Sequence, residues 1–596
     1  MDAIVNDFTL NIATANGTGS QSANLILLDS LFEMGVPVSG KNLFPSNISG
    51  LPTWYILRLS DNGYQAPGDR THIQILVNPA TWEEDLEALE PGSVVIWNSD
   101  TKKKTVERED ICSYPVPMTS LARKINPKLA KLVTNIIYVG VVAELLGIDQ
   151  KCLEDAVSKQ FKGKTSAIEL NIQALQSGRD YCSENLTKND PFIVEKREKT
   201  NSQFFIEGNE AVALGSIYGG CQMLAWYPIT PSSSIAEGII AYIPRLRTDE
   251  DGKTNLAVIQ AEDELAAAGM VIGAGWAGGR GMTATSGPGI SLMQEFIGLA
   301  YFAEVPSVFW DVNRVGPSTG LPTRTQQSDI GMLYEGSHGD TQHIVLIPGT
   351  VEECFEFGWV AFDCAERFQT PIFGLSDLDL GMNKWACSGF EYPDKPMDRG
   401  KVVREKDVFE AFETFGRYLD VDGDGIPYRT LPGSGMDPIL YRGTGHNPMG
   451  VYSEKPDDYH NLMTRLKMKI ENSRDLLPEP LMREEEDADI GVIYLGSMEN
   501  SIQEIDDILL GMGHKVNQCR IRALPYHSNV EEFIRRHKTT IVLEINRDGQ
   551  MYGILRRELS NDIVTKVHSV AYSDGLPPRA RIYANLVDEK LKEVGH

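Results

Sequence analysis

Three polar side chains stand just after hydrophobic runs, and each is of a type that does chemistry at the edge of an α/β sheet. Thr230 ends the stretch "AWYPIT", Glu264 follows the strand-like "LAVIQ", and Arg314 follows "VPSVFWDVN". A desolvated carboxylate binds a ligand nitrogen, and a guanidinium fork binds a carboxylate through two hydrogen bonds. Glu264 therefore suits a ligand nitrogen and Arg314 a ligand carboxylate.

The corner that ends at Thr230 contains two prolines. Pro228 and Pro231 hold the residues before them extended, so Met223 to Ile229 is predicted as a strand that ends abruptly. Thr230 is then expected as the N-cap of a helix, with Pro231 in its first position. Ligands of open α/β sheets bind at such corners, although a well-capped connection without a ligand explains the same residues.

Glu264 is the last residue of an acidic triplet with Glu262 and Asp263. Acidic residues favour helix starts because of the helix dipole, which accounts for any one of the three. Glu264, however, leads directly into "LAAAGMVIGAG", where a carboxylate is desolvated and therefore unfavourable unless something hydrogen-bonds to it. A buried ligand nitrogen would supply that bond.

Arg314 precedes a stretch rich in hydroxyls, "VGPSTGLPTRTQQSD", which contains Ser318, Thr319 and Thr323. An arginine at the end of a strand is equally well explained as a surface charge. With these hydroxyls it also forms a plausible receptor for carboxylates, because the guanidinium binds one carboxylate and hydroxyls complete the shell.

An acidic loop, "DVDGDG", places Asp420, Asp422 and Asp424 at alternate positions. It lacks the bidentate glutamate of an EF-hand, because Leu431 stands in the twelfth position. The three carboxylates are therefore left with two interpretations, a site for a lone cation or a solvated turn of the Asx type.

The elements that must position these residues alternate between strands and helices, which favours an α/β fold with mostly parallel sheets. A chain of 596 residues is too long for one core. A polar stretch at 183–203 and an acidic, proline-bearing stretch at 476–489 each precede a fresh strand. We expect domains at 1–185, 200–440 and 490–596, with 441–489 as a connecting segment.

The charge balance is strongly acidic, with 83 Asp and Glu against 56 Lys and Arg and a formal net charge of -27. Such a charge repels phosphate backbones and acidic membrane surfaces, so neither nucleic acid nor membrane is an expected partner. The start "MDAIVNDF" carries acids where a secretory signal carries bases, and a cytoplasmic location is expected. The eight cysteines include no CxxC pair, so no local iron–sulfur or zinc signature is present.

Several motifs, taken in order, resemble the α chain of the 2-oxoacid:ferredoxin oxidoreductases. They are "YPITPSS", the glutamate before "LAAAGMVIGA", "TATSGPG", "VNRVGPSTGLPT", "RTLPGSG", "RGTGH" and the late "LEINRDGQMYG". "GPSTGLPT" looks most like the 2-oxoglutarate branch. The N-terminal part resembles the γ domain of this family fused in front, with "PVSGKNLFPSNISGLPTW" supporting the fused form.

The resemblance implies a thiamine-diphosphate enzyme that decarboxylates a 2-oxoacid, passes electrons to ferredoxin and transfers the acyl group to coenzyme A. In this family the α chain holds the pyrimidine ring, while a separate β subunit carries the diphosphate, Mg²⁺ and a [4Fe-4S] cluster, in an (αβ)2 assembly. The implied domains are a Rossmann-like γ domain associated with coenzyme A, a pyrimidine-binding domain and a transketolase C-terminal-like domain.

Carried onto this chain, the resemblance gives each residue a role. Tyr227, Pro228, Ile229 and Thr230 would line the cofactor, Glu264 would bond the pyrimidine nitrogen, and Arg314 would hold the carboxylate of the substrate. Ser318, Thr319 and Thr323 are weaker candidates for the second carboxylate of 2-oxoglutarate. Two alternatives stay open: an enzyme for pyruvate or branched-chain oxoacids, and a non-catalytic scaffold subunit.

Overall fold

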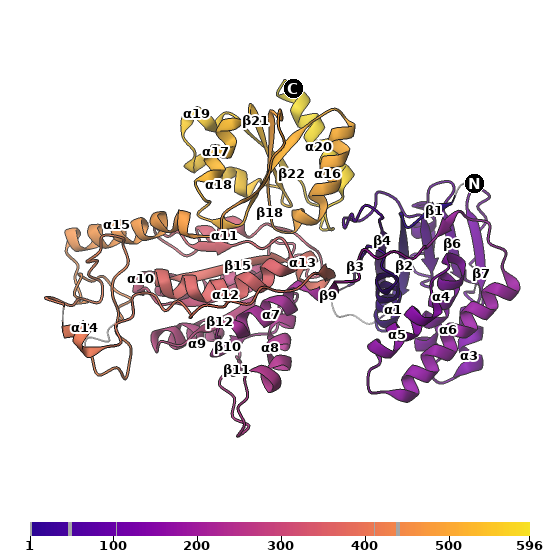
Figure 1. The fold of residues 1–596 in the computed structure, drawn as a ribbon, viewed down its shortest axis with the longest axis horizontal. Coiled ribbons are helices and arrows are strands. Elements are labelled where there is room, and N and C mark those ends of the chain that lie inside the picture. Colours follow the sequence, from indigo (N-terminus) through magenta and orange to yellow (C-terminus); the bar gives the residue numbers. More distant parts are fainter. Residues whose placement is uncertain (1–2, 46–49, 103, 411, 437–440, 596) are drawn as a thin grey trace. The chain divides into compact units, whose positions relative to one another are not determined.

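The computed structural model describes residues 3–45, 50–102, 104–410, 412–436 and 441–595, and these form two compact units (Figure 1). The first unit is Met1–Phe205 with two short segments, Gln503–Ile505 and Pro577–Ile582. The second is Ile206–Ile502, Asp506–Leu576 and Tyr583–His596. The predicted linker at 183–203 ends close to this division, and the domain limits given above stay predictions.

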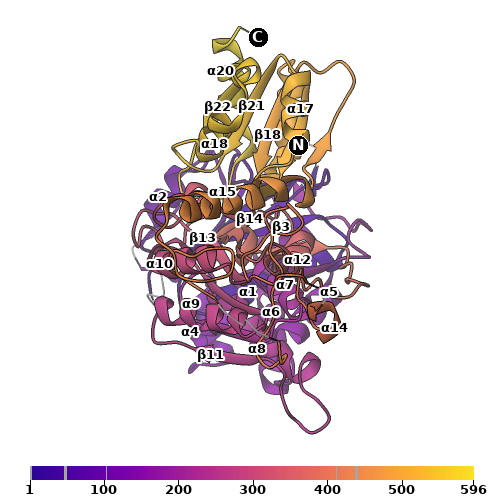
Figure 2. The ribbon, with the colours of Figure 1, turned by 90° about the vertical axis from the view of Figure 1, so that its left-hand side faces the viewer.

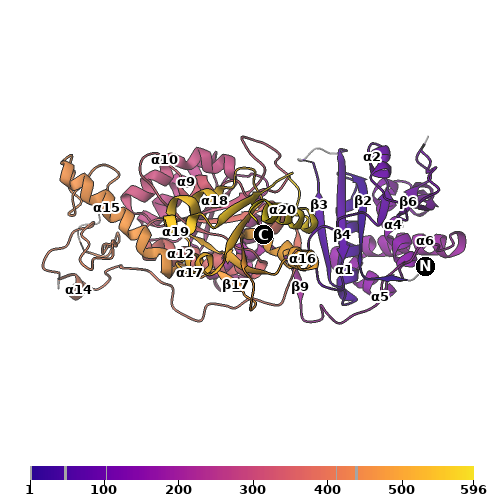
Figure 3. The ribbon, with the colours of Figure 1, turned by 90° about the horizontal axis from the view of Figure 1, so that it is seen from above.

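The first unit is a mixed six-stranded sheet with helices packed on it. The strand order is β3-β4-β2-β5-β6-β7, in which β4 runs antiparallel to both of its neighbours and the other pairs are parallel. Helices α4 and α6 lie side by side (Figure 3), because Gly140 and Gly178 let their backbones approach: a Cβ at Gly140 would lie 2.1 Å from the carbonyl oxygen of Leu175. The strands are β2 (Phe8–Ala15), β3 (Val38–Leu43), β4 (Pro52–Leu59), β5 (Ile73–Leu76), β6 (Val94–Asn98) and β7 (Cys112–Val116), and the helices include α1 (Ser20–Glu33), α3 (Met118–Ile125), α4 (Ala130–Leu146), α5 (Gln150–Gln160) and α6 (Thr165–Asn185).

The second unit is built on a seven-stranded sheet of order β11-β10-β12-β13-β15-β14-β20, parallel except for its last strand. Buried apolar side chains on both faces of the sheet pack against the helices that connect these strands. The strands are β10 (Met223–Trp226), β11 (Ala257–Gln260), β12 (Gly281–Thr285), β13 (Ser307–Asn313), β14 (Ile344–Leu346), β15 (Pro371–Asp377) and β20 (Ala523–Leu524), and the helices include α7 (Gly208–Tyr218), α8 (Ser233–Leu246), α9 (Glu264–Trp276), α10 (Gly287–Ala303), α11 (Ile330–Tyr334) and α12 (Val351–Phe368).

A second, five-stranded sheet of the same unit has the order β17-β19-β18-β21-β22 and is parallel except for β17. Helices α17 and α20 lie on opposite sides of its strands (Figure 2). Strand β20 follows β19 and joins the large sheet, so one apolar core runs from Phe373 to Ile493. The strands are β17 (Leu481–Arg483), β18 (Ile490–Leu495), β19 (Val516–Ile521), β21 (Thr539–Glu544) and β22 (Val567–Ala571), with helices α16 (Glu499–Gly511), α17 (Asn529–Arg536), α18 (Gln550–Glu558) and α20 (Ala580–Glu593).

The expected α/β fold with several mostly parallel sheets is confirmed. Within the described ranges, no single helix is long and apolar enough to cross a membrane. Helices α3 and α4 together would meet that criterion, but they are bent by 118° at their junction, and α4 is buried along most of its length.

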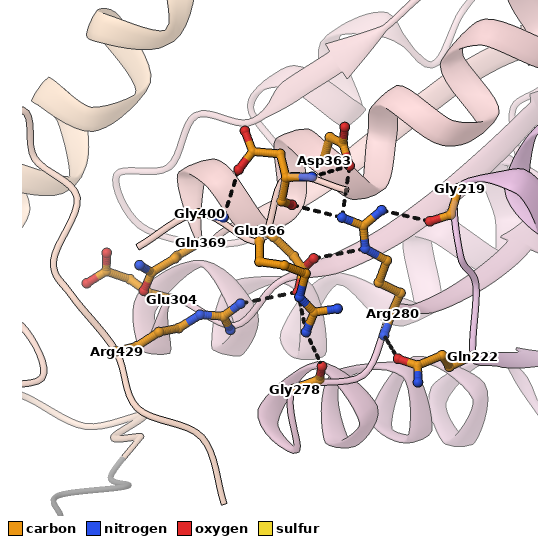
Figure 4. A network of polar contacts seen from close by, with 12 residues as sticks. Gly219, Gln222, Gly278, Arg280, Glu304, Asp363, Glu366, Gln369, Gly400 and Arg429 are labelled. Carbon is orange, nitrogen blue, oxygen red and sulfur yellow. Dashed lines mark hydrogen bonds and ion pairs between the residues drawn. The ribbon is translucent and has the colours of Figure 1, made fainter. Parts of the chain in front are cut away.

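A buried ion network anchors the segment between β16 (Lys384–Cys387) and α15 (Pro456–Ser473), which is largely irregular over its described residues. Glu366 of α12 accepts a hydrogen bond from Nε of Arg280 at 2.9 Å and forms ion pairs with Arg399 and Arg429 (Figure 4). Arg280 also donates to Asp363 at 2.8 Å. Glu366 is thus the shared anion of three guanidinium groups.

Glu366→Gln is expected to lower the melting temperature by about 4–6 °C, because removing one partner of a buried ion network costs about 3–5 kcal/mol. The exposed pair Lys467–Glu471 on α15 offers a control, since Glu471→Gln removes a surface ion pair and is expected to shift the midpoint by less than about 1 °C. Calorimetry measures both. Equal shifts for the two variants would contradict the anchoring role of Glu366.

Candidate active site

Four neighbouring strands of the large sheet end at one edge and deliver the candidate residues there. The carboxyl ends of β11, β10, β12 and β13 lead to Glu264, Thr230, Ser286 and Arg314, in that spatial order. Strand β10 pairs with β11 on one side and with β12 on the other. The chain therefore adds β11 on one side of β10 and then crosses to the opposite side to add β12, so the strand order reverses at β10. Open parallel sheets bind ligands at such a switch point.

The corner at Thr230 differs from the prediction. Strand β10 ends at Trp226, and helix α8 begins at Ser233 with Ser232 as its N-cap, so Thr230 is not a cap. The carbonyl oxygen of Ile229 accepts hydrogen bonds from the backbone N–H groups and the hydroxyls of Ser232 and Ser233, which closes a tight turn around Thr230. The Thr230–Pro231 bond is cis. Tyr227 and Pro228 are exposed, whereas Ile229 and Thr230 are half-buried.

Glu264 is the first residue of α9 and is 8% exposed. Its neighbour Asp263 caps the helix by accepting a hydrogen bond from the N–H of Ala266 at 2.7 Å, and Glu262 is exposed. None of the described residues donates a hydrogen bond to the Glu264 carboxylate. A Cβ at Gly289 of α10 would lie 3.0 Å from Cγ of Glu264, so the side chain lies closely under this helix.

Arg314 follows β13 and is 7% exposed. Its Nη1 donates to the carbonyl oxygen of Thr230 at 2.8 Å, which brings two of the predicted residues together. Its Nε is buried and has no partner in the part of the chain that the structure describes. Burial lowers the pKa of the Arg314 guanidinium, while the nearby carboxyls of Asp311 and Asp329 oppose this effect.

A cavity of about 480 Å³ opens beside Arg314. Ser318 and Thr319 line it together with the start of α10, and both are exposed. Ser318 has a φ of 59°, in the left-handed region. Thr323 is buried and is absent from the described lining; its Oγ1 lies 3.5 Å from Nη1 of Arg324. The cavity therefore unites two of the three predicted hydroxyls with Arg314.

Two carboxyls of this site were not predicted from the sequence. Asp329 lines the cavity just before α11, and Asp311 lies fully buried within β13. Burial and the Asp329 charge raise the pKa of Asp311 well above its usual range, and burial raises the pKa of Asp329 to about 6. A charged residue inside the apolar run "VFWDVN" was the available signal, because buried strands rarely contain one without a purpose.

The acidic loop does not form a cation cluster. Lys401 occupies its centre, with ion pairs of 2.6 Å to Asp422 and 2.8 Å to Asp424, and Asp420 accepts the N–H groups of Gly423 and Gly425. Within the described ranges, no group of three or more His, Cys, Asp or Glu side chains could hold a metal ion. The ammonium group of Lys401 thus pairs with two of the three carboxylates that the sequence suggested for a cation, Asp422 and Asp424.

The chain matches two family models. Residues 214–407 match the thiamine-diphosphate-binding model of the pyruvate flavodoxin/ferredoxin oxidoreductases, and residues 9–181 match the pyruvate ferredoxin/flavodoxin oxidoreductase model.

Relatives of known description are subunits of enzymes that act on 2-oxoacids. The 2-oxoglutarate synthase subunit KorA of Methanothermobacter thermautotrophicus is 37% identical over 60% of this chain and 90% of its own length. Subunit alpha of the 2-oxoacid:ferredoxin oxidoreductase 2 of Aeropyrum pernix is 29% identical over 93% of both chains. A solved structure, the 2-oxoglutarate:ferredoxin oxidoreductase from Magnetococcus marinus with 2-oxoglutarate, coenzyme A and succinyl-CoA bound, is 28% identical, covers 98% of this chain and 100% of its own, and superposes with a TM-score of 0.87.

The matched models cover the N-terminal sheet and the strands β10 to β15 of the large sheet, with Thr230, Glu264 and Arg314, and the resemblance inferred from the motifs is confirmed. The chain belongs to the α subunits of the thiamine-diphosphate-dependent 2-oxoacid:ferredoxin oxidoreductases.

Proposed function

We propose that this subunit acts in the oxidative decarboxylation of 2-oxoglutarate to succinyl-CoA and carbon dioxide, or its reverse, with ferredoxin as electron carrier. The observation that carries the proposal is the cavity in which Arg314 lies with Ser318 and Thr319. A guanidinium and a separate pair of hydroxyls can serve the two carboxylates of a dicarboxylic oxoacid. The KorA relative and the Magnetococcus marinus structure, both described by 2-oxoglutarate, support the same substrate.

The residues at the sheet edge fit thiamine diphosphate. Glu264 is a buried carboxylate that no described donor satisfies, so it can hold a protonated ring nitrogen. When bound, thiamine diphosphate supplies the nucleophilic carbon and the electron sink for decarboxylation. Glu264 would orient the pyrimidine ring and stabilise its proton, and Tyr227 to Ile229 would lie beside the ring. Thr230, whose carbonyl oxygen accepts a hydrogen bond from Arg314, would present its hydroxyl to the same site.

The remaining parts of the reaction are assigned to a partner. We infer a β subunit that carries the diphosphate site, Mg²⁺ and a [4Fe-4S] cluster, in an (αβ)2 complex that docks ferredoxin. Support comes from this sequence itself, which has eight cysteines but no CxxC pair. Coenzyme A is assigned to the region of the N-terminal unit, which matches a model of the same enzymes.

The deciding experiment is reduction of a viologen dye by this chain purified with its co-expressed partner, in the presence of coenzyme A. We expect the dye to be reduced with 2-oxoglutarate and to be reduced much more slowly with pyruvate or 2-oxoisovalerate. Preference for one of those two acids would refute the dicarboxylate pocket but keep the chemistry. No reduction by a cofactor-loaded complex would favour a scaffold subunit.

Ser318→Gly combined with Thr319→Val is expected to lower kcat/KM for 2-oxoglutarate by about 10–100-fold. One hydrogen bond to a charged group contributes about 1.5–3 kcal/mol, and the two exposed hydroxyls together are expected to contribute about as much as one buried donor. Glycine removes the Ser318 hydroxyl without strain at its φ of 59°. The same variant should change kcat/KM for 2-oxobutyrate, which lacks the second carboxylate, by less than about threefold. Equal losses for both acids would contradict a role in selecting dicarboxylates.

A further inference from the structure

Asp311 and Asp329 form a buried acid pair beside Arg314. Both oxygens of Asp311 are buried and no described residue donates a hydrogen bond to either, while the charge of the neighbouring Asp329 raises the pKa of Asp311. A carboxyl buried without a donor is favourable only in its neutral form, and that form can donate to the Asp329 carboxylate. Two carboxylates cannot hydrogen-bond to each other unless one of them carries a proton. The pair therefore holds one proton and one negative charge, and that charge balances the guanidinium of Arg314.

The negative charge of the pair faces the cavity. Asp329 lines the cavity, and its Oδ2 accepts a hydrogen bond from Nδ2 of Asn313 at 2.5 Å. Asn313 also holds the loop from the other side, because its Oδ1 accepts the N–H of Ser328 at 2.6 Å. An oxoacid whose carboxylate binds to Arg314 thus brings a second negative charge to a site where Asp329 is fixed.

Helix α18 of the smaller sheet prevents the Asp329 loop from moving away. Nε2 of Gln550 donates to the carbonyl oxygen of Ser328 at 2.6 Å, and Oε1 of the same side chain accepts the N–H of Gly331 at 2.9 Å. Nδ2 of Asn546 donates to the carbonyl oxygen of Gln327 at 2.9 Å. Because Asp329 lies between these clamped residues, repulsion from a bound anion cannot be relieved by a swing of the loop.

We propose that Asp329, paired with Asp311, is a proton-accepting residue of the substrate pocket that binds one proton from solvent when an anionic oxoacid binds beside Arg314. The proton goes to the Asp329 carboxylate, and no bond of the substrate changes in this step. The inference rests on the proposed function, since it assigns the oxoacid to the Arg314 cavity. Asp329 then becomes a hydrogen-bond donor toward that cavity.

The charged groups around the pair are few. Strand β13 contributes Asp311 and Arg314, which are the groups that shift the pKa of Asp329 besides burial. The residues that face the pair from helices α10 and α18 are uncharged, namely Gly287 and Gln550. Asp377, at the end of β15, accepts hydrogen bonds from Ser497 and Gln327. The pKa of Asp329 is about 6, and an anion bound nearby raises the pKa of a carboxyl, so protonation at neutral pH is within reach.

The test is calorimetric titration of the cofactor-loaded complex at pH 7.5 in phosphate and in Tris, whose different ionisation enthalpies reveal bound protons. The probes are N-oxalylglycine, an isostere of 2-oxoglutarate, and oxamate, an isostere of pyruvate. The wild-type complex should take up about 0.5–1 proton per bound probe, with a Kd that rises with pH above about 6. Asp329→Asn should take up almost none and show a Kd that is flat between pH 6 and 8.

Two further variants keep the result interpretable. Asp340→Asn changes an exposed carboxylate that is not part of the cavity lining and should retain the wild-type proton uptake. Asp311→Asn keeps a donor to Asp329 but removes the second titratable carboxyl, so it should retain the uptake because the proton goes to Asp329. Unchanged uptake in Asp329→Asn would overturn the proposal. Loss of uptake in Asp311→Asn would place the proton on Asp311 and would overturn it equally, even if Asp329→Asn does not fold. Binding of oxamate with proton uptake, but not of N-oxalylglycine, would instead refute only the dicarboxylate substrate.

Discussion

Glu264→Ala is expected to abolish oxoacid decarboxylation, with a loss of at least about 10²–10⁴-fold, the usual contribution of a positioned acid–base group. The carboxylate is 8% exposed and no described donor satisfies it, so a ligand N–H that reaches it gains a charge-assisted hydrogen bond. Alanine removes that acceptor, so the pyrimidine nitrogen of thiamine diphosphate would have no hydrogen-bond partner on this helix. Release of carbon dioxide from labelled 2-oxoglutarate in a single turnover, without coenzyme A or ferredoxin, measures this step alone.

The triplet that contains Glu264 provides its own control. Glu262 is two residues away and exposed, so Glu262→Ala changes the same charge without touching the site, and its rate should stay within about twofold of the wild type. Glu264→Gln tests the chemistry more closely, because the amide keeps the shape but loses the charge that stabilises a protonated ring. Assembly with the partner subunit should be unchanged in all three variants. Wild-type turnover in Glu264→Ala would refute the role assigned to this residue.

The edge of the large sheet could be predicted because strand ends and chemistry coincide there in the sequence. Glu264 and Arg314 each follow a hydrophobic run, and parallel strands deliver their carboxyl ends to the same edge. The local sequence pattern could not predict the order of the strands within the sheet. Strand β10 lies between β11 and β12, and this long-range pairing places Thr230 within hydrogen-bonding distance of Arg314.

The corner at Thr230 was predicted wrongly in detail for a physical reason. A threonine before Pro231 satisfies the local rules for an N-cap, but Ser232 and Ser233 compete for the same task and close the turn on Ile229 instead.

The pair of Asp311 and Asp329 shows a different limit. The two residues are 18 positions apart, on a strand and after a long loop, and although Asp311 stands out inside an apolar run, no local pattern pairs it with Asp329. Only the fold brings them together, since Gln550 and Asn546 from a distant sheet fix the loop over the strand. Sites that depend on two domains are therefore the part of a function that sequence patterns miss most easily.

Arg314→Ala is expected to lower kcat/KM for the oxoacid by about 10²–10³-fold, because a guanidinium that binds a carboxylate contributes about 1.5–3 kcal/mol for each of its two hydrogen bonds. Its Nε is buried without a partner among the described residues, and its Nη1 is fixed by Thr230, so the side chain is positioned to receive a ligand. Removing Arg314 also removes the positive charge that stabilises the carboxylate form of Asp329. The pKa of Asp329 should therefore rise, and the site should bind an anionic substrate less tightly.

Arg245, in the last turn of the helix whose first turn follows Thr230, is the matched control. It is exposed, so Arg245→Ala should leave kcat/KM within about twofold of the wild type. Added guanidinium ion should restore part of the activity of Arg314→Ala, since the ion can fill the vacated space, whereas Arg314→Lys should recover little because an ammonium lacks the planar fork. A loss confined to kcat in Arg314→Ala, with an unchanged Kd for N-oxalylglycine, would show that this arginine does not bind the carboxylate and acts on a later step.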